Sequence, residues 1–298
     1  MNKKMLSQLI SICCLSAIIL LISSCSYHSD TVSKANKSLT TNSEKNTLNP
    51  SQLINAYGFS NNPGNLLITL SNQEASLAEL KDFNIAIGNK GQIIPIAYEK
   101  KQSPQKPISI NENSSNFEYL DGHLYRALNG KFLANHTYLL ANDKDFPLRS
   151  LVPLVDTELE NNKFPVADTK NIEQFQVLKN RKIIESRLLA KTKDNNEIDL
   201  FIFEEKNKEM LATIAYCYKG QIIYKDFPAK LDASSSWRVD SGTDPGLFEV
   251  MFLAKCEEGF TLGLTWTGPE GENILILKTR AEKFIDTPLN NYRYFGSY

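Results

Sequence analysis

The chain has 298 residues, with 33 basic and 34 acidic side chains and a formal charge of −1. Hydrophobic residues make up 42% of it and aromatic residues 10%, which is enough for a packed core and excludes a wholly disordered chain. A nearly neutral charge without an extended basic stripe argues against nucleic acid as a partner.

The N-terminus has the pattern of a secretory signal peptide over residues 1–24. Lys3 and Lys4 form a basic start, residues 9–22 form an apolar run, and small residues follow it. This run is short for a membrane span, which needs about 20 apolar residues. Export followed by cleavage is therefore expected.

The last residues of this segment, Leu21-Ile22-Ser23-Ser24-Cys25, resemble the lipobox of bacterial lipoprotein precursors. That resemblance implies a diacylglyceryl group on the thiol of Cys25, cleavage between Ser24 and Cys25, and further acylation with a fatty acid such as palmitate. Ile22 stands where the family most often has leucine. The alternative is an ordinary secreted protein with a coincidental cysteine.

The resemblance covers only the first 25 residues, and the body of the chain matches no motif of that family. It implies an exported protein held by lipid on a bacterial membrane surface, either the outer leaflet of the cell membrane or an outer membrane. Two or three acyl chains anchor a protein stably, whereas one alone is marginal. The mature chain keeps 31 basic and 34 acidic residues, so its charge is −3.

Residues 25–52 hold the lipidated cysteine and a flexible tether. The stretch is rich in Ser, Thr, Asn and Lys and offers almost nothing to bury, and His28 lies within it. A short helix capped by Ser51 and stopped at Gly58 is expected at the start of the folded body.

An N-terminal β-rich module is predicted over residues 53–165. A strand is expected at residues 65–71, and a hairpin over residues 83–99 turns at Asn89-Lys90-Gly91. A second hairpin is expected to pair residues 123–127 with 132–140 around Asn129-Gly130. Residues 101–116 are predicted to form an exposed loop, and the polar run 156–163 to form part of the connection to a second module.

A C-terminal antiparallel β-module is predicted over residues 166–298. Asp168 or Thr169 should cap a short helix, and seven strand-like runs follow with short turns between them. Such short connections favour a sandwich or barrel over alternating βαβ units. The strands are expected at residues 182–192, 198–204, 211–218, 221–227, 247–255, 260–266 and 273–279.

Two local patterns in these strands lead to specific expectations. Phe248, Val250 and Phe252 alternate with Glu249, so the three apolar residues should share a buried face while Glu249 is exposed. Residues 85–94 (IAIGNKGQII) and 214–223 (IAYCYKGQII) agree at seven of ten positions. They reflect either an internal duplication or two hairpins that use the same Lys-Gly turn.

Cysteine and histidine suggest no catalytic or metal site. Cys217 and Cys256 could form a disulfide in an exported protein, or remain two buried thiols. His123 and His136 lack the spacing of zinc ligands. The tetrapeptide 103–106 fits the S-x-x-K pattern of penicillin-recognising enzymes, but its companion motifs are missing. No cofactor motif is present.

Aromatic residues are dense near the C-terminus. They either form a stacking surface for a sugar, peptide or protein, or belong to a terminal strand that packs on the core. The most favoured function is non-catalytic binding or assembly at the bacterial envelope, with a protein or an envelope polymer as partner. The alternatives are a lipid-anchored hydrolase acting on envelope material and a solute-binding component of a transporter. The aromatic residues are Trp237, Trp266, Tyr292, Tyr294, Phe295 and Tyr298.

Overall fold

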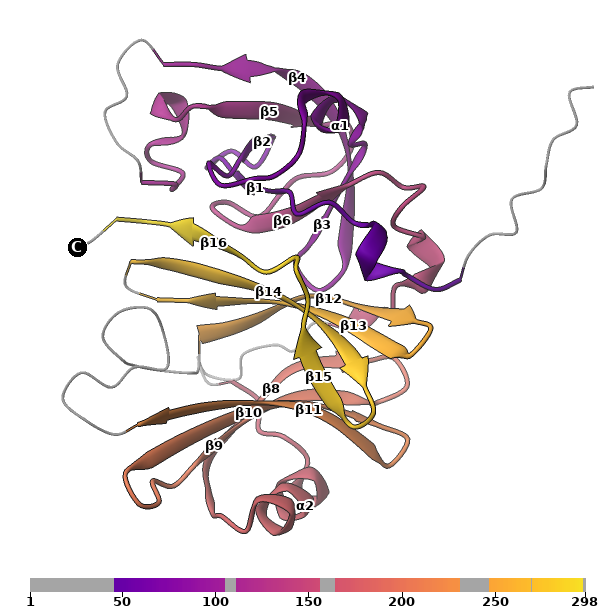
Figure 1. Ribbon diagram of the computed structural model, residues 1–298, viewed down its shortest axis with the longest axis vertical. Helices are drawn as coiled ribbons and strands as arrows, with labels where there is room; N and C mark the ends of the chain where they lie inside the picture. Colours follow the sequence, from indigo (N-terminus) through magenta and orange to yellow (C-terminus); the bar gives the residue numbers. More distant parts are fainter. Residues whose placement is uncertain (1–45, 105–110, 156–163, 231–246, 269, 297–298) are drawn as a thin grey trace, which may run out of the picture. The chain divides into compact units, whose positions relative to one another are not determined.

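A computed structural model describes residues 46–104, 111–155, 164–230, 247–268 and 270–296. Within these ranges the protein is mainly β, with two sheets and two α-helices (Figure 1). Every strand pair but one is antiparallel, and the exception joins β11 and β15 at a single pair of residues. The predicted fold class, two antiparallel β-modules with a few short helices, is confirmed.

The first sheet is a closed six-stranded barrel with strand order β1-β2-β5-β4-β3-β6. The short helix α1 (Leu77–Asp82) begins at a capping box, in which Ser76 and Glu79 bond each other's backbone amides. Single-turn 3₁₀ helices at Pro50–Gln52, Phe117–Tyr119 and Leu148–Ser150 complete this half. The barrel strands are β1 (Tyr57–Ser60), β2 (Leu66–Thr69), β3 (Ile85–Gly88), β4 (Gln92–Gln102), β5 (Gly122–Ala127) and β6 (Thr137–Ala141).

The second sheet has ten strands, with β16 paired to β14 beside the main path β12-β13-β14-β15-β11-β10-β9-β8-β7. All seven strands expected in this half are present, and sequence analysis missed β15 and β16. β7 pairs with β8, so this sheet begins before residue 166. Its strands are β7 (Leu154–Val155), β8 (Ile183–Thr192), β9 (Glu197–Phe203), β10 (Glu209–Tyr218), β11 (Gln221–Lys230), β12 (Phe248–Cys256), β13 (Gly259–Thr267), β14 (Gly271–Arg280), β15 (Lys283–Asp286) and β16 (Asn291–Tyr294).

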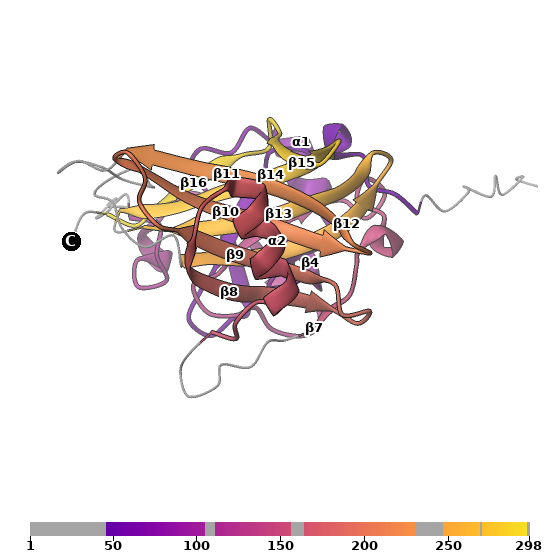
Figure 2. The same ribbon diagram turned by 90° about the horizontal axis from the view of Figure 1, so that it is seen from below.

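Helix α2 (Thr169–Lys179) lies across one face of the second sheet (Figure 2). Of the two N-caps expected from the sequence, Asp168 is the one observed, and it accepts a hydrogen bond from the Lys170 amide. Phe175 is fully buried and stacks on Phe201 of β9, with ring centroids 4.5 Å apart. No helix in the described ranges has the length and apolar character that a membrane span requires.

The chain enters the folded body differently from the prediction. Instead of a helix reaching Gly58, there is one 3₁₀ turn at Pro50–Gln52, and β1 follows at Tyr57. Buried strand residues override the local helix signal here, because Tyr57 packs in the cluster shared by the barrel and the second sheet, and its hydroxyl donates to the Leu289 carbonyl at 2.6 Å. Leu48, assigned to the tether, is 1% exposed and donates its amide to the Lys255 carbonyl at 2.7 Å.

The first predicted hairpin, β3–β4, is present, but the second is wrong. β5 pairs with β2 and β4, whereas β6 pairs with β1 and β3. The reason lies in the segment after the Asn129-Gly130 turn. Phe132 donates its amide to the Gly64 carbonyl and packs its ring on Tyr138, with centroids 5.0 Å apart. This diverts the chain over the β1–β2 turn and away from β5.

The repeated sequence forms one hairpin in each sheet, but the two turns differ. In β3–β4, Gly88 opposes Gln92 across a three-residue turn. In β10–β11, Tyr218 opposes Gln221 across the two-residue turn Lys219-Gly220, whose φ angles of 50° and 79° suit a tight hairpin. The identical residues therefore occupy different positions relative to the strand pairing in the two hairpins. This favours two hairpins that use a similar turn over an internal duplication.

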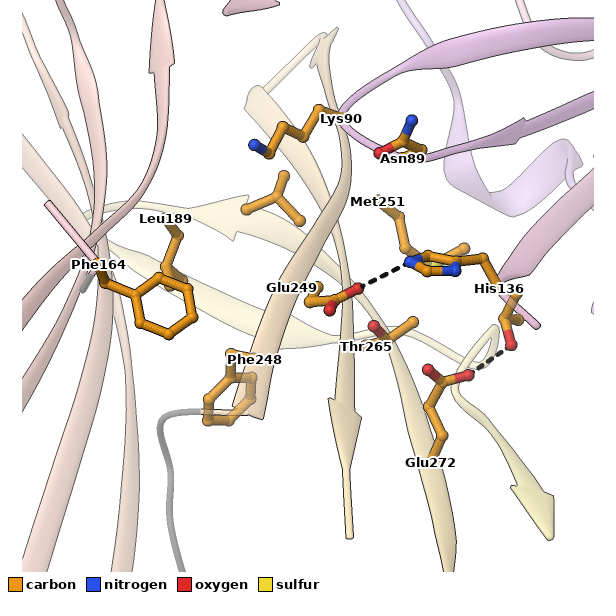
Figure 3. A pocket seen from close by; sticks show the side chains of 12 residues that line it. Asn89, Lys90, His136, Phe164, Leu189, Phe248, Glu249, Met251, Thr265 and Glu272 are labelled. Atoms are coloured by element: carbon orange, nitrogen blue, oxygen red, sulfur yellow. Dashed lines mark hydrogen bonds and ion pairs between the residues drawn. The ribbon is translucent and has the colours of Figure 1, made fainter. Parts of the chain in front are cut away.

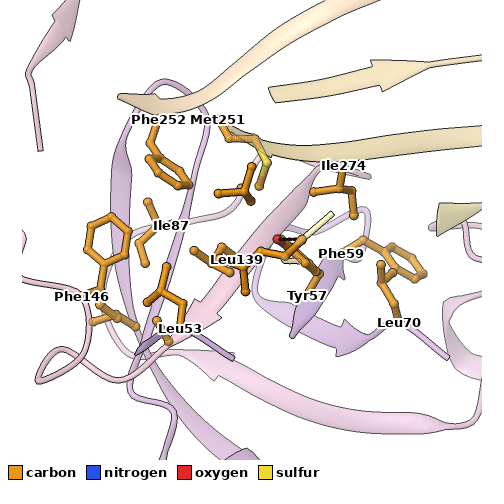
Figure 4. Close-up of a cluster of buried hydrophobic side chains, with 14 of the residues drawn as sticks. Leu53, Tyr57, Phe59, Leu70, Ile87, Leu139, Phe146, Met251, Phe252 and Ile274 are labelled. Carbon is orange, nitrogen blue, oxygen red and sulfur yellow. Dashed lines mark hydrogen bonds between the residues drawn. The ribbon is translucent and has the colours of Figure 1, made fainter. Parts of the chain in front are cut away.

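Strand β12 contributes side chains to two separate cores, and a β-bulge changes which of its residues face each core. Its pairing with β13 shifts register between Val250 and Phe252. Phe248 and Val250 belong to the cluster enclosed by the second sheet, whereas Met251 and Phe252 belong to a cluster shared with the barrel (Figure 4). The expectation that Phe252 shares a face with Phe248 and Val250 is wrong, because a bulge inverts the alternation of side chains.

Phe252 nevertheless occupies the buried position expected of it. Its side chain is fully buried, and its ring meets Phe146 edge to face at 5.4 Å. The opposing strand provides space through Gly263, where an added Cβ would lie 2.6 Å from the Phe252 ring. A glycine is required at this close approach.

Replacement of Phe252 by alanine is expected to lower the free energy of unfolding by about 3 kcal/mol. This is the lower end of the range for emptying a buried aromatic site, because the flexible neighbour Met251 can move into the space. Chemical denaturation measures the change. The same substitution at exposed Glu249 should change stability by no more than about 0.5 kcal/mol. Equal losses at both positions would contradict the assignment of the buried side.

Candidate functional site

A cleft of about 360 Å³ lies where the barrel meets the second sheet (Figure 3). The β3–β4 turn and the start of β6 contribute residues from the barrel, and β8, β12, β13 and β14 contribute residues from the second sheet. One side is apolar and the other polar. The lining residues are Asn89, Lys90, His136, Thr137, Phe164, Leu189, Phe248, Glu249, Val250, Met251, Thr265 and Glu272.

The β3–β4 turn is held against the cleft by backbone hydrogen bonds to β12. The Lys90 amide donates to the Val250 carbonyl at 3.0 Å, and the Gly91 amide donates to the Met251 carbonyl at 2.7 Å. These carbonyls belong to the bulged segment of β12. The turn therefore satisfies groups that would otherwise be unpaired, and it fixes Asn89 and Lys90 at the cleft.

Phe248 gives the apolar side a rigid base. Its ring stacks on Trp266 at 4.5 Å and lies 4.9 Å from the ring of Phe227. Leu189 of β8 and Phe164 line the cleft beside it (Figure 3). Packing on both neighbours leaves the Phe248 ring little freedom to rotate, so this wall is largely preformed.

The polar side holds two carboxylates in different environments. The Glu249 side chain is 64% exposed, and its Oε2 lies 3.7 Å from Nε2 of His136. Glu272 is buried and accepts a hydrogen bond from the Thr137 hydroxyl. Burial raises the pKa of Glu272, and the nearby Arg293 guanidinium opposes this rise. One acid is thus solvated while the other is shielded from water.

His136 is oriented by the backbone. Its Nδ1 lies 2.9 Å from the Ala134 carbonyl oxygen, which can only accept, so Nδ1 carries the proton. Nε2 is thereby directed toward Glu249, where the ring forms an ion pair when both nitrogens are protonated. His136 is partly exposed, as the sequence predicted, but its pairing with Glu249 was not foreseen.

The other residues singled out from the sequence do not form a site together. Cys217 and Cys256 are both free thiols, on β10 and β12, so the alternative of a disulfide between them is not formed. His123 contacts the Tyr98 hydroxyl through Nδ1 at 3.2 Å. Ser103 donates to Asp121, and the lysine of its S-x-x-K pattern lies outside the described residues.

The C-terminal aromatic residues pack on the second sheet. Tyr292 and Tyr294 belong to β16, which pairs antiparallel with β14, and Trp266 is 6% exposed within the core. The alternative of a terminal strand packing on the core is confirmed for these residues. Cys25, Trp237 and Tyr298 lie outside the described residues.

Sequence analysis missed that Glu272 and the β3–β4 turn line the cleft. A signal for Glu272 does exist, since a carboxylate within an otherwise apolar strand needs a buried partner. No comparable signal marks the turn, because its contact with β12 is purely backbone. Within the described residues, no group of three or more His, Cys, Asp or Glu side chains is placed to hold a metal ion.

Comparison with protein-family models, curated proteins and solved structures gives no significant match. The cleft must therefore be interpreted from its own chemistry. It combines a rigid aromatic wall, an exposed carboxylate with a histidine partner, and a buried carboxylate. This combination can bind an amphipathic ligand and orient it through polar groups.

Proposed function

We propose that this protein is a lipid-anchored component of a bacterial envelope that binds a protein or envelope polymer through the cleft without catalysing a reaction. The cleft, with its preformed apolar side and fixed polar side, is the observation that carries the binding function. The sequence from Leu21 to Cys25 carries the anchoring.

Binding without catalysis is favoured by the pairing of the polar groups. Glu272 is engaged by Thr137 and lies 3.9 Å from Arg293, and Glu249 faces His136. These contacts hold the polar groups in position for recognition, and none of the residues that line the cleft is a serine or cysteine that could act as a nucleophile beside His136.

Substitution of Cys25 by alanine is expected to abolish membrane anchoring, because the thiol is the site of lipid attachment in lipobox-containing precursors. Fractionation should move the protein to the soluble fraction or leave an uncleaved precursor. Mass spectrometry of the wild type should detect acyl groups on an N-terminal Cys25. Cys14→Ala is the matched control and should remain anchored. An unmodified mature N-terminus at another residue would contradict the proposal.

Reversal of the exposed charge in the cleft tests the binding function. We expect Glu249→Lys to weaken binding of the mature protein to isolated envelope polymers, or to a partner crosslinked in intact cells, about tenfold, equivalent to about 1.4 kcal/mol. Co-sedimentation and quantitative crosslinking provide the measurements. Glu118→Lys, a charge reversal at another exposed glutamate outside the cleft, should bind normally. Equal binding by both variants would exclude the cleft.

The two carboxylates of the cleft favour a hydrolase as the second candidate. Enzymes that cleave glycosidic bonds use a pair of acids with different environments, and Glu249 and Glu272 differ in this way. Release of soluble fragments from envelope polymers distinguishes the two functions. Fragments that appear with the wild type and disappear with Glu249→Gln would establish the hydrolase and reject pure binding.

A further inference from the structure

A second hollow, of about 400 Å³, lies at the N-terminal end of α2. The first turns of the helix, the β8–β9 turn and the β10–β11 turn form its walls. Five of its thirteen lining residues carry side-chain amides, which both donate and accept hydrogen bonds. These amides are Asn171, Gln174, Asn195, Asn196 and Gln221.

The floor of this hollow is preorganised by Asn171. Its Nδ2 donates to Glu197 Oε2 at 3.1 Å and to Asp199 Oδ2 at 3.0 Å. Glu197 also accepts a hydrogen bond from the Asp168 amide at 3.0 Å and lies 3.4 Å from the Lys191 ammonium. The side chains at the floor therefore hold one another in place, as the groups of a binding site must.

Asp199 leaves one hydrogen-bonding position open beneath this floor. The residue is fully buried, and its Oδ1 has no hydrogen-bond partner in the part of the chain that the structure describes. Its other oxygen contacts Asn171 and the Cys217 thiol, both of which line the hollow. Asp199 does not itself line the hollow, and it supports the floor from below through these two contacts.

The charges around the hollow nearly cancel. Lys170, Lys191 and Lys219 line it together with Asp168 and Glu197. Lys191 is already paired with Glu197, and the Asp168 carboxylate caps α2. A strongly charged ligand would gain little here, whereas a neutral ligand rich in hydroxyl groups would find many donors and acceptors.

From this geometry we propose that the hollow binds a neutral saccharide unit, whose hydroxyl groups pair with the side-chain amides and with the groups at its floor. This site is separate from the cleft, and its existence does not depend on the function proposed for the cleft. The saccharide can be a free sugar or one residue of an envelope glycan, since both present the same hydroxyl chemistry.

Calorimetric titration of the mature protein, made soluble by Cys25→Ser, provides the test. The probes are glucose, N-acetylglucosamine and a soluble N-acetylglucosamine oligomer, with inorganic phosphate, glycine and a neutral tripeptide as non-saccharide probes. We expect saturable binding of at least one saccharide and weaker or no binding of the others. Binding of the single sugars indicates a free ligand, and binding of the oligomer alone indicates a glycan; both support the site.

Gln174→Ala and Gln221→Ala combined remove two exposed amides without touching the floor. This variant should bind the saccharide at least about tenfold more weakly while its unfolding midpoint is unchanged. Gln52→Ala, an exposed change outside the hollow, is the control. Absence of saccharide binding, equal binding by the double variant, or tighter binding of phosphate, glycine or the tripeptide would overturn the proposal.

Discussion

Replacement of Arg293 by methionine is expected to lower the free energy of unfolding by about 5 kcal/mol, the upper end of the range for breaking a buried ion pair. The Arg293 side chain is fully buried in β16, 3.9 Å from Glu272. It donates to the Glu112 carbonyl at 2.7 Å and to the Asn135 carbonyl at 2.9 Å, and its guanidinium lies over the Phe59 ring.

The large effect arises from the acids left behind. Methionine has similar length and is apolar, so packing is largely kept, but Glu272 and Glu112 lose their shared cation. Arg280→Met, at the exposed end of β14, is the matched control and should cost less than about 0.5 kcal/mol. Adding Glu272→Gln to Arg293→Met should recover part of the loss. If the double variant is no more stable than Arg293→Met alone, the buried charge is not the cause.

Asp199→Asn is expected to stabilise the protein most strongly in alkaline solution. Burial, reinforced by the charge of Glu197, raises the pKa of Asp199 from 3.8 to about 8. The folded state therefore holds a proton that the unfolded chain releases at lower pH. The stability contributed by this protonated carboxyl is fully present below pH 4 and is lost as the pH rises toward 8.

Each pH unit in this window costs about 1.4 kcal/mol, so the total is on the order of 6 kcal/mol. Asparagine cannot ionise, so the variant should gain on the wild type progressively between pH 5 and pH 8 and no further above that. Denaturant unfolding at pH 5, 7 and 9 measures this gain. Asp194→Asn, in the exposed β8–β9 turn, should show a pH profile parallel to the wild type. A constant difference across the range would mean that Asp199 does not titrate as the structure indicates.

The sequence predicted strands well where the signals are local. Turn residues such as Lys219-Gly220 mark the ends of the strands of the second sheet, and alternating apolar residues mark the strands between successive turns. Pairing was harder, because the return of β6 beside β1 and β3 depends on a backbone contact between Phe132 and Gly64, which has no side-chain signature. The bulge at Met251 was also invisible, since an uninterrupted apolar run has no marked break in alternation.

The candidate site was harder to predict from the sequence than the strands and their pairing. Glu249 and His136 are 113 positions apart in the sequence, and only the contact between the barrel and the second sheet brings them together. Acidic residues in apolar strands are a local clue to buried polar positions, and they include Glu272 at the cleft and Glu197 and Asp199 at the hollow beside α2. Each is buried and held by hydrogen bonds from other elements.

The position of β12 between two cores has a consequence for how the protein unfolds. This one strand supplies Phe248 and Leu253 to the core of the second sheet and Phe252 to the core shared with the barrel. Unfolding of either half would expose buried side chains of the other half to water. Heat or denaturant should therefore unfold both halves in a single cooperative transition. A chain cut between residues 142 and 153 would leave the outer face of the barrel, including Leu139, open to water and prone to aggregation.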